Sequence, residues 1–413
     1  MRIQLPLIPP EPDEPVRFGP TDLAIAAALF VIAAAVSYAN SGFWGPFVPF
    51  QEFENLYFHA DLNTVYSNLV SRASNHYRTS AHPLFSIIGW PLTAALQLTG
   101  LSGVTSVRIL LAVVAGLVVA TLYAVLRLLT LRALDAALFA GLLIATGSFV
   151  FWATVPETFA FGGLSILLAL VIFAVRRDSP PALVLASVLA LSFTITNWMV
   201  ACYGTLTTQT LRKAIRIFAI AFAITATLWT VQRLTFSRSG APGKVGRYAM
   251  YVRLPEKMDM PVLLAGSVIA PEPAHSSLMG RLQLSAEKGA FELRDPLVTA
   301  GVALWTLLLV GGGVAMARAQ GRRALRLIIA LTLGSQILLH AGFADGPFLY
   351  GMHYLPLLIL VAAHGSLTRL RPFVIAALVA LIPIALIHNL DVHRSVARDL
   401  HTDLAPEFEA RPR

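Results

Sequence analysis

Residues 43–101 form the first long polar interruption in an apolar chain, and they read FWGPFVPFQEFENLYFHADLNTVYSNLVSRASNHYRTSAHPLFSIIGWPLTAALQLTGL. This stretch gathers ionisable side chains between two apolar segments: Glu52, Glu54, His59, Asp61, Arg72, His76, Arg78 and His82. Carboxylates beside a lipid bilayer are costly to desolvate unless they have a role. The stretch therefore predicts a functional surface, and the apolar segments around it predict the scaffold that carries it.

The composition of the whole chain is that of a membrane protein. Of the 413 residues, 56% are hydrophobic and 13% are charged, and the mean hydropathy is +0.70. A soluble domain carries about 25% charged residues. In lipid, a crossing segment must satisfy its backbone hydrogen bonds within a helix. We therefore expect an all-α, polytopic membrane protein with about eleven transmembrane helices.

The distribution of arginine predicts the topology. Arg2 and Arg17 precede the first apolar segment, which places residues 1–20 in the cytoplasm and the outer loop 39–103 on the other side. The apolar residues 83–101 are expected to form a juxtamembrane or half-inserted helix that stays outside. The predicted crossings are residues 23–38, 104–126, 136–152, 159–175, 182–195, 198–211, 217–231, 297–315, 327–343, 354–363 and 373–387.

This topology divides the chain into four further regions. A transmembrane core occupies residues 21–231, and a second outer loop follows at residues 232–295. Residues 296–390 form the C-terminal transmembrane helices, and residues 391–413 form a polar tail.

The basic charge of the chain fits the same picture. The net charge is +9, which in a soluble protein would suggest a nucleic-acid partner. Here the basic residues lie mostly in short loops between apolar segments, so we expect contact with membrane lipids and no nucleic acid. Cys202 is the only cysteine, which excludes an intramolecular disulfide and a thiolate metal cluster.

Two acidic residues outside the predicted spans are the candidates for catalysis. In HADLNTVYSNL, Asp61 shares a helical face with Val65 and Asn68 and lies near the helix N-terminus, where negative charge is favourable. Its carboxylate can act as a general base, or it can simply cap the helix. Glu157 follows Pro156 in a short outer turn, where it either joins the site or marks the membrane boundary.

The remaining polar residues favour anion binding. The second outer loop is rich in arginine and lysine, so Arg247 and Arg253 would bind a lipid phosphate there, unless the loop is only solvated beside anionic lipid. The histidines show no HxH or HExxH spacing. No metal ligands are therefore assigned, and a divalent cation is left open as a cofactor. The chain has no P-loop and no GxSxG motif, which argues against a nucleotide-driven enzyme.

These features together resemble the GT-C superfamily of integral membrane glycosyltransferases. The resemblance rests on Asp61 in a long first outer loop, Glu157 in the VPET turn and Arg108 at the second crossing, and on the segments RTSAHPLFSIIGWPL and FLYGMHYLPLLILVAAHG. His353 stands in the last segment where many relatives carry arginine. The resemblance implies a polyprenyl-phosphate-linked sugar donor and a glycan, lipid or protein acceptor. The site would face the periplasm from a bacterial inner membrane.

The resemblance implies an inverting sugar transfer. Asp61 would deprotonate the acceptor hydroxyl, Glu157 would orient the acceptor or support the site, and basic groups would stabilise the leaving phosphate. An alternative is a transporter or lipid flippase, but the middles of the predicted spans carry almost none of the ionisable residues it requires. A non-catalytic membrane scaffold is a third reading. The candidates for substrate binding are Glu54, Tyr66, Arg78, His82, Arg247, Arg253, His353 and Tyr354.

Overall fold

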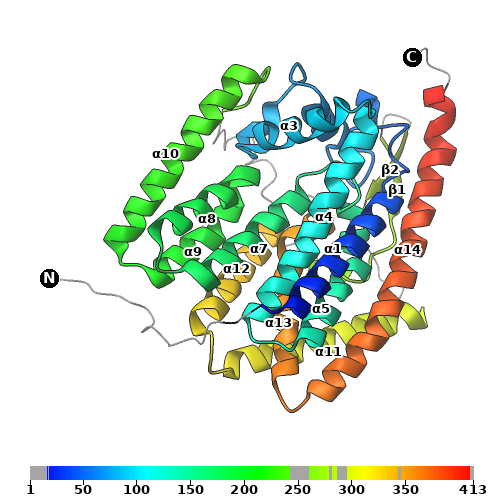
Figure 1. Ribbon diagram of the computed structural model, residues 1–413. Coiled ribbons are helices and arrows are strands. Elements are labelled where there is room, and N and C mark those ends of the chain that lie inside the picture. Colours follow the sequence, from blue (N-terminus) through cyan, green and yellow to red (C-terminus); the bar gives the residue numbers. More distant parts are fainter. Residues whose placement is uncertain are drawn as a thin grey trace.

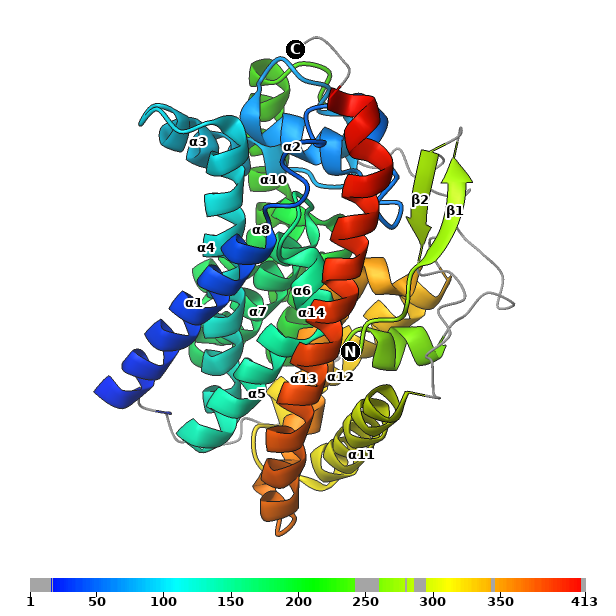
Figure 2. The ribbon, with the colours of Figure 1, turned by 90° about the vertical axis from the view of Figure 1, so that its right-hand side faces the viewer.

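The computed structural model describes residues 16, 18–241, 260–278, 281–285, 295–342 and 346–409, which form a bundle of helices (Figures 1 and 2). Its α-helices are α1 (Pro20–Asn40), α2 (Leu62–Val70), α3 (Phe85–Gln97), α4 (Gly103–Leu128), α5 (Ala133–Ala145), α6 (Gly147–Trp152), α7 (Phe159–Arg176), α8 (Pro180–Phe193), α9 (Trp198–Thr208), α10 (Leu211–Thr235), α11 (Pro296–Arg318), α12 (Arg323–Gly342), α13 (Gly351–Ala363) and α14 (Arg371–Glu409). Shorter helical turns are η1 (Gln51–Phe53), η2 (Tyr77–Ser80), η3 (Ile195–Asn197), η7 (Val262–Gly266), η8 (Pro347–Tyr350) and η9 (His364–Leu367).

Among the described helices, 8 are long and apolar enough to cross a membrane, which supports an integral membrane protein. They are α1, α4, α7, α10, α11, α12, the segment Phe348–Leu367 around α13, and α14 as far as Thr402. The other predicted crossings fall on shorter helices, namely α5 with α6, α8 and α9. Helix α11 also runs obliquely to α4 and α14 (Figures 1 and 2). The predicted segments are therefore helical, while the number that cross stays a prediction.

The predicted crossing 136–152 is divided into two helices at Thr146. This residue has an extended backbone, with ψ 153°, and its hydroxyl accepts a hydrogen bond from the N–H of Phe149 at 3.3 Å. A threonine in this arrangement caps the N-terminus of a helix. Helix α5 therefore ends at Ala145, and α6 begins as a separate short helix.

Glycines allow close packing between neighbouring helices. A Cβ atom at Gly116 of α4 would lie 2.6 Å from the ring of Phe30 in α1. A Cβ atom at Gly312 of α11 would lie 2.4 Å from the Cα of Ala362 in α13. Small residues at these positions let the helices approach each other, as is common in membrane bundles.

The residues between α1 and α4, numbered 41–102, cover one end of the bundle, called the loop end below. They contact the turns that follow α6 and α10 and the C-terminal end of α8. Helix α3 lies across this end (Figure 1), as expected of a juxtamembrane helix. The contacts are a 2.7 Å bond from Trp44 Nε1 to Thr154 O, a 2.9 Å bond from Leu84 N to Ser192 O, and a 3.2 Å bond from His76 N to Ser237 O.

The opposite end of the bundle carries the predicted cytoplasmic arginines and is called the arginine end. Arg127, in the last turn of α4, donates to Asp22 of α1 at 2.6 Å. Arg371, at the start of α14, donates to Asp135 of α5 with two bonds of 2.7 Å. Segments expected on one side of a membrane thus lie together at one end of the bundle.

The expectation of an entirely helical chain needs one addition. Strands β1 (Ala274–Leu278) and β2 (Arg281–Ser285) form an antiparallel hairpin in the second outer loop. Leu284 of β2 also bonds to the first loop, accepting from the N–H of Phe58 at 3.0 Å. The hairpin therefore attaches the second outer loop to the first.

Helix α14 continues without a break into the predicted polar tail. Val392, Val396 and Leu400 are buried and recur every fourth residue, which is the spacing of one helix face. The ring of His393 packs edge-on against Phe43, with ring centres 5.0 Å apart. This part of α14 therefore packs on the first loop.

Candidate active site

The loop end brings Asp61 and Glu157 together from distant parts of the sequence. The backbone N–H of Asp61 donates a hydrogen bond to Oε1 of Glu157 at 2.8 Å. The guanidinium of Arg78 forms an ion pair with Asp61, and its Nη2 lies 3.7 Å from Oε2 of Glu157. The Asp61 side chain is 30% exposed, whereas that of Glu157 is 1% exposed. Asp61 is therefore the carboxylate that a substrate can reach, and Glu157 is the one that holds the arrangement.

Asp61 does not act as a helix cap. It occupies the N-cap position of α2, but its side chain makes no capping hydrogen bond. Its carboxylate turns to Arg78 instead. Glu54 takes over the cap, because its two oxygens accept from the N–H of Thr64 at 3.0 Å and from the Thr64 hydroxyl at 2.6 Å. Because Glu54 makes the capping hydrogen bonds, the carboxylate of Asp61 is not used for capping.

The backbone just before Asp61 is strained. Asn55, Phe58 and His59 have positive φ values of 65°, 51° and 60°, a region that bulky side chains seldom adopt. The bond from Phe58 to Leu284 of the hairpin helps to hold this conformation. Such strain persists only where the surrounding structure imposes it, and it is frequent at functional sites.

Glu157 is fixed in the turn between α6 and α7. Its Oε2 accepts a hydrogen bond from the N–H of Thr158 at 2.9 Å, in addition to the bond that Oε1 accepts from Asp61. Burial raises the pKa of the Glu157 carboxyl group, while the charge of Arg78 and the Thr158 bond oppose that rise. A buried carboxylate with two N–H donors and a cation beside it is suited to positioning its neighbours.

Glu54 is the third carboxylate of the cluster. Burial raises the pKa of its carboxyl group, the bonds from Thr64 and the charge of Arg78 lower it, and the charge of Glu157 raises it again. Three carboxylates thus share the field of one guanidinium. This concentration of negative charge keeps Arg78 at the centre of the site.

His82 supports Arg78 from the other side. Nη2 of Arg78 lies 3.4 Å from Nε2 of His82, and Nδ1 of His82 contacts the carbonyl oxygen of Phe193. Burial, with a smaller effect of Arg78, lowers the pKa of His82 to about 3, so its ring is neutral near pH 7. A neutral ring can donate from Nδ1 to Phe193 and accept from Arg78 at Nε2. His82 is therefore a positioning residue for Arg78.

His353 and Tyr354 lie in α13, within a second polar cluster inside the bundle. The rings of His353 and His340 are 5.7 Å apart, and both side chains are buried. Three ring nitrogens have no hydrogen-bond partner within the described part of the chain: Nδ1 and Nε2 of His353, and Nδ1 of His340. Nε2 of His340 lies 2.9 Å from Oε1 of Gln336, whose amide donates to Asn197 at 3.2 Å.

Several residues of the two clusters were not predicted from the sequence. His340, Gln336 and Asn197 were missed, although a histidine inside the predicted span 327–343 was an available signal. The sequence also gave no sign that Arg78 would join Asp61 to Glu157, because that contact depends on tertiary folding.

The other predicted binding residues lie elsewhere or are not described. Tyr66 packs its ring 6.4 Å from that of Trp44, with its hydroxyl beside Gly103 at the start of α4. Arg247 and Arg253 lie outside the described residues. Within the described residues, no group of three or more His, Cys, Asp or Glu side chains could hold a metal ion.

The chain matches no protein-family model, and no curated protein is significantly similar to it. Its function is therefore argued from the site.

Proposed function

We propose that this chain is a GT-C type membrane glycosyltransferase, which moves a sugar from a polyprenyl-phosphate donor to an acceptor. The observation that carries the proposal is the joining of Asp61, Arg78 and Glu157 at the loop end. The reaction needs an accessible carboxylate to take a proton from the acceptor. It also needs a cation near the departing phosphate. Asp61 and Arg78 supply these groups, and Glu157 fixes both.

In the proposed reaction, the acceptor hydroxyl attacks the anomeric carbon of the donor sugar. Asp61 takes the hydroxyl proton as the new carbon–oxygen bond forms. The bond between the anomeric carbon and the phosphate oxygen breaks, and its electron pair leaves with the polyprenyl phosphate. Attack from the side opposite the leaving group inverts the anomeric centre.

Arg78 would change partners during this reaction. While it is paired with Asp61, it stabilises the ionised carboxylate, which makes Asp61 a reluctant proton acceptor. A phosphate offers the guanidinium a partner that accepts two parallel hydrogen bonds. As negative charge grows on the leaving phosphate, Arg78 would turn toward it and release Asp61 to take the proton. Arg247 and Arg253 would add further positive charge from the second outer loop.

The proposed site faces away from the cytoplasm. The loops at the arginine end are those that the positive-inside rule assigns to the cytoplasm, and the carboxylate cluster lies at the opposite end. With about eleven crossings in a bacterial inner membrane, the site would open to the periplasm. The acceptor there would be a glycan, a lipid or a protein.

The proposal is tested with purified protein in liposomes that contain an undecaprenyl-phosphate-linked sugar with a radioactive label. We expect label to pass to an acceptor fraction and undecaprenyl phosphate to accumulate, both dependent on Asp61. Mass spectrometry of the purified protein should also detect a bound polyprenyl phosphate. Absence of turnover with several donors, together with absence of any bound polyprenyl phosphate, would reject the proposal.

A lipid flippase or transporter is the second candidate, and the buried pair of His340 and His353 favours it. Ionisable residues inside membrane spans often belong to transport pathways. Here both ring nitrogens of His353 and Nδ1 of His340 lack partners among the described residues. The two candidates differ in their products. A flippase would move a labelled lipid across the liposome without consuming it, would fail in His340→Phe, and would be unaffected in Asp61→Asn.

A further inference from the structure

The turn that leads into Asp61 is held by the hairpin of the second outer loop. Gln283 of β2 donates from Nε2 to the carbonyl oxygen of Asn55 at 3.2 Å, and the same nitrogen lies 3.3 Å from Nδ1 of His59. Both partners belong to the strained turn that ends two residues before Asp61. We propose that Gln283 is a positioning residue for Asp61. Its role rests on the proposed function, in which Asp61 is the base.

The amide group of Gln283 presents its oxygen and its nitrogen to different partners. Its Oε1 lies 3.4 Å from the hydroxyl of Ser276, which donates across the hairpin, and its Nε2 faces the first loop. The NH₂ group has two hydrogens, enough for both Asn55 and His59. His59 then accepts at Nδ1 and carries its own proton on Nε2. One side chain therefore bonds to both ends of the turn.

Backbone hydrogen bonds align Gln283 with the turn. The N–H of Phe58 donates to the carbonyl oxygen of Leu284 at 3.0 Å, and the N–H of Leu284 donates to that of Leu56 at 2.9 Å. The side chain of Leu284 is buried. Because Gln283 directly precedes Leu284 in β2, these bonds fix the point from which its side chain extends.

Helix α14 also contacts the hairpin. Nε2 of His275 in β1 lies 3.5 Å from Oδ2 of Asp399 in α14, and Figure 2 shows the two strands beside the C-terminal half of this helix. The ring of His393, in the same part of α14, packs on the first loop. The hairpin is therefore attached to α14 through β1 and to the turn through β2.

The strain in the turn explains why these bonds matter for Asp61. Positive φ values at Asn55, Phe58 and His59 must be imposed by surrounding groups. Without the bonds from Gln283, the turn would relax toward ordinary backbone conformations and shift Asp61, which follows it. A displacement of about 1 Å at a catalytic group can lower turnover by about 10²-fold. The effect of Gln283 is therefore expected in kcat.

The test replaces the amide with an apolar side chain of the same length. Gln283→Met loses both donated hydrogen bonds. We expect kcat for transfer from an undecaprenyl-phosphate-linked sugar in liposomes to fall about tenfold, while KM for the donor changes by less than about twofold. Backbone amides of residues 55–61 should exchange with deuterium about tenfold faster. Transfer at the rate of an active wild type would overturn the proposal, whether or not exchange is faster.

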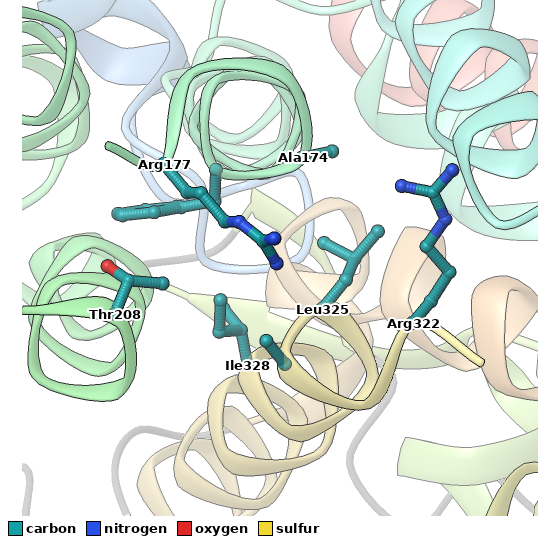
Figure 3. Close-up of a pocket in the computed structure, with 8 residues that line it drawn as sticks. Ala174, Arg177, Thr208, Arg322, Leu325 and Ile328 are labelled. Atoms are coloured by element: carbon teal, nitrogen blue, oxygen red, sulfur yellow. The ribbon is translucent and has the colours of Figure 1, made fainter. Parts of the chain in front are cut away.

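Thr208→Val is the control for a lost hydrogen bond far from the site. Thr208 lines a recess at the arginine end of the bundle (Figure 3), and its hydroxyl donates to the carbonyl oxygen of Gly204 at 2.8 Å. Neither transfer nor the exchange of residues 55–61 should change by more than about twofold in this variant. Equal losses in both variants would show general destabilisation and contradict the positioning role.

A second variant and the exchange measurement keep the result decisive. If Gln283→Met does not fold, Gln283→Asn takes its place, because its amide lies one methylene group short of Asn55 and His59. A lower kcat with an unchanged KM supports the proposal, and a wild-type kcat contradicts it. If the wild type transfers no sugar from any donor, the proposed function fails, and the catalytic role of Gln283 fails with it, while exchange still shows whether Gln283 holds the turn. If the wild type is active and Gln283→Met exchanges and transfers at the same rates, the positioning role alone fails.

Discussion

The backbone N–H of Asp61 and Oε1 of Glu157 form a 2.8 Å hydrogen bond that ties the first loop to the turn between α6 and α7. Because this bond uses the backbone N–H of Asp61, any residue except proline can donate it from position 61. Only a side chain with an acceptor can complete it at position 157. The two carboxylates can therefore be tested separately. The Asp61 side chain is the exposed one, whereas the Glu157 side chain holds the backbone of the first loop in place.

Glu157→Gln should destabilise the protein. In glutamine an NH₂ group replaces one of the two carboxylate oxygens, so a donor would face the N–H of either Asp61 or Thr158, and the charge that faces Arg78 is lost. We expect the free energy of unfolding to fall by about 1–3 kcal/mol, seen as a lower thermal midpoint in detergent. Asp178→Asn is the control, because that carboxylate is 90% exposed. An unchanged midpoint in Glu157→Gln would contradict the positioning role.

The neutral ring of His82 should make stability depend on pH. Its pKa is lowered to about 3 from an ordinary value of 6.5. As the pH falls from 6.5 toward 3, the unfolded chain takes up a proton that the folded chain refuses, so stability declines across that window. Between pH 7 and pH 5 the part of the loss due to His82 is roughly 2 kcal/mol.

His82→Asn isolates this contribution. Asparagine keeps an N–H donor for Phe193 and does not titrate, so the variant should lose less stability between neutral and acid pH than the wild type. Thermal midpoints of both proteins, measured over that range, provide the comparison. If both decline equally, His82 is not held as a buried neutral ring.

Chemical labelling should place the two ends of the bundle on opposite sides of the membrane. Cys202 is the only native cysteine, so Cys202→Ala provides a background for single cysteines at the exposed positions Ala73, Ser276 and Gln320. A maleimide that cannot cross membranes should modify cysteines at 73 and 276 in intact cells. It should modify one at 320 only after permeabilisation. The reverse pattern would put the carboxylate cluster in the cytoplasm and contradict the proposed donor.

Apolar length and arginine placement were enough to predict the helices and their alternation between two ends. The hairpin β1–β2 was not predicted, because its strands are short and Leu284 gains its partners only from the first loop. The packing of α14 beyond the last predicted span was readable in principle. Val392, Val396 and Leu400 recur at helical spacing there, but the polar residues between them suggested a tail.

The sequence pointed to the two carboxylates of the candidate site, but it did not predict the contacts that they make. Asp61 and Glu157 stand out because acidic residues beside apolar segments are rare and costly. That Glu54 would cap α2 in place of Asp61 could not be predicted, since the local pattern fits either residue. His353 was among the predicted binding residues, but its pairing with His340 was missed, because a lone histidine in an apolar segment is more often a packed residue than a ligand.

Asp61→Asn should remove transfer and leave the fold intact. The backbone bond to Glu157 survives, and asparagine can still accept a hydrogen bond from Arg78, but it cannot take a proton from the acceptor. Transfer from a lipid-linked donor should fall by about 10²-fold or more, while stability changes by less than about 1 kcal/mol because the ion pair is partly exposed. Asp178→Asn should alter neither quantity. If Asp61→Asn melts normally and transfers sugar at the wild-type rate, the loop carboxylate is structural, and Glu54, whose pKa is raised by burial, becomes the next candidate for the base.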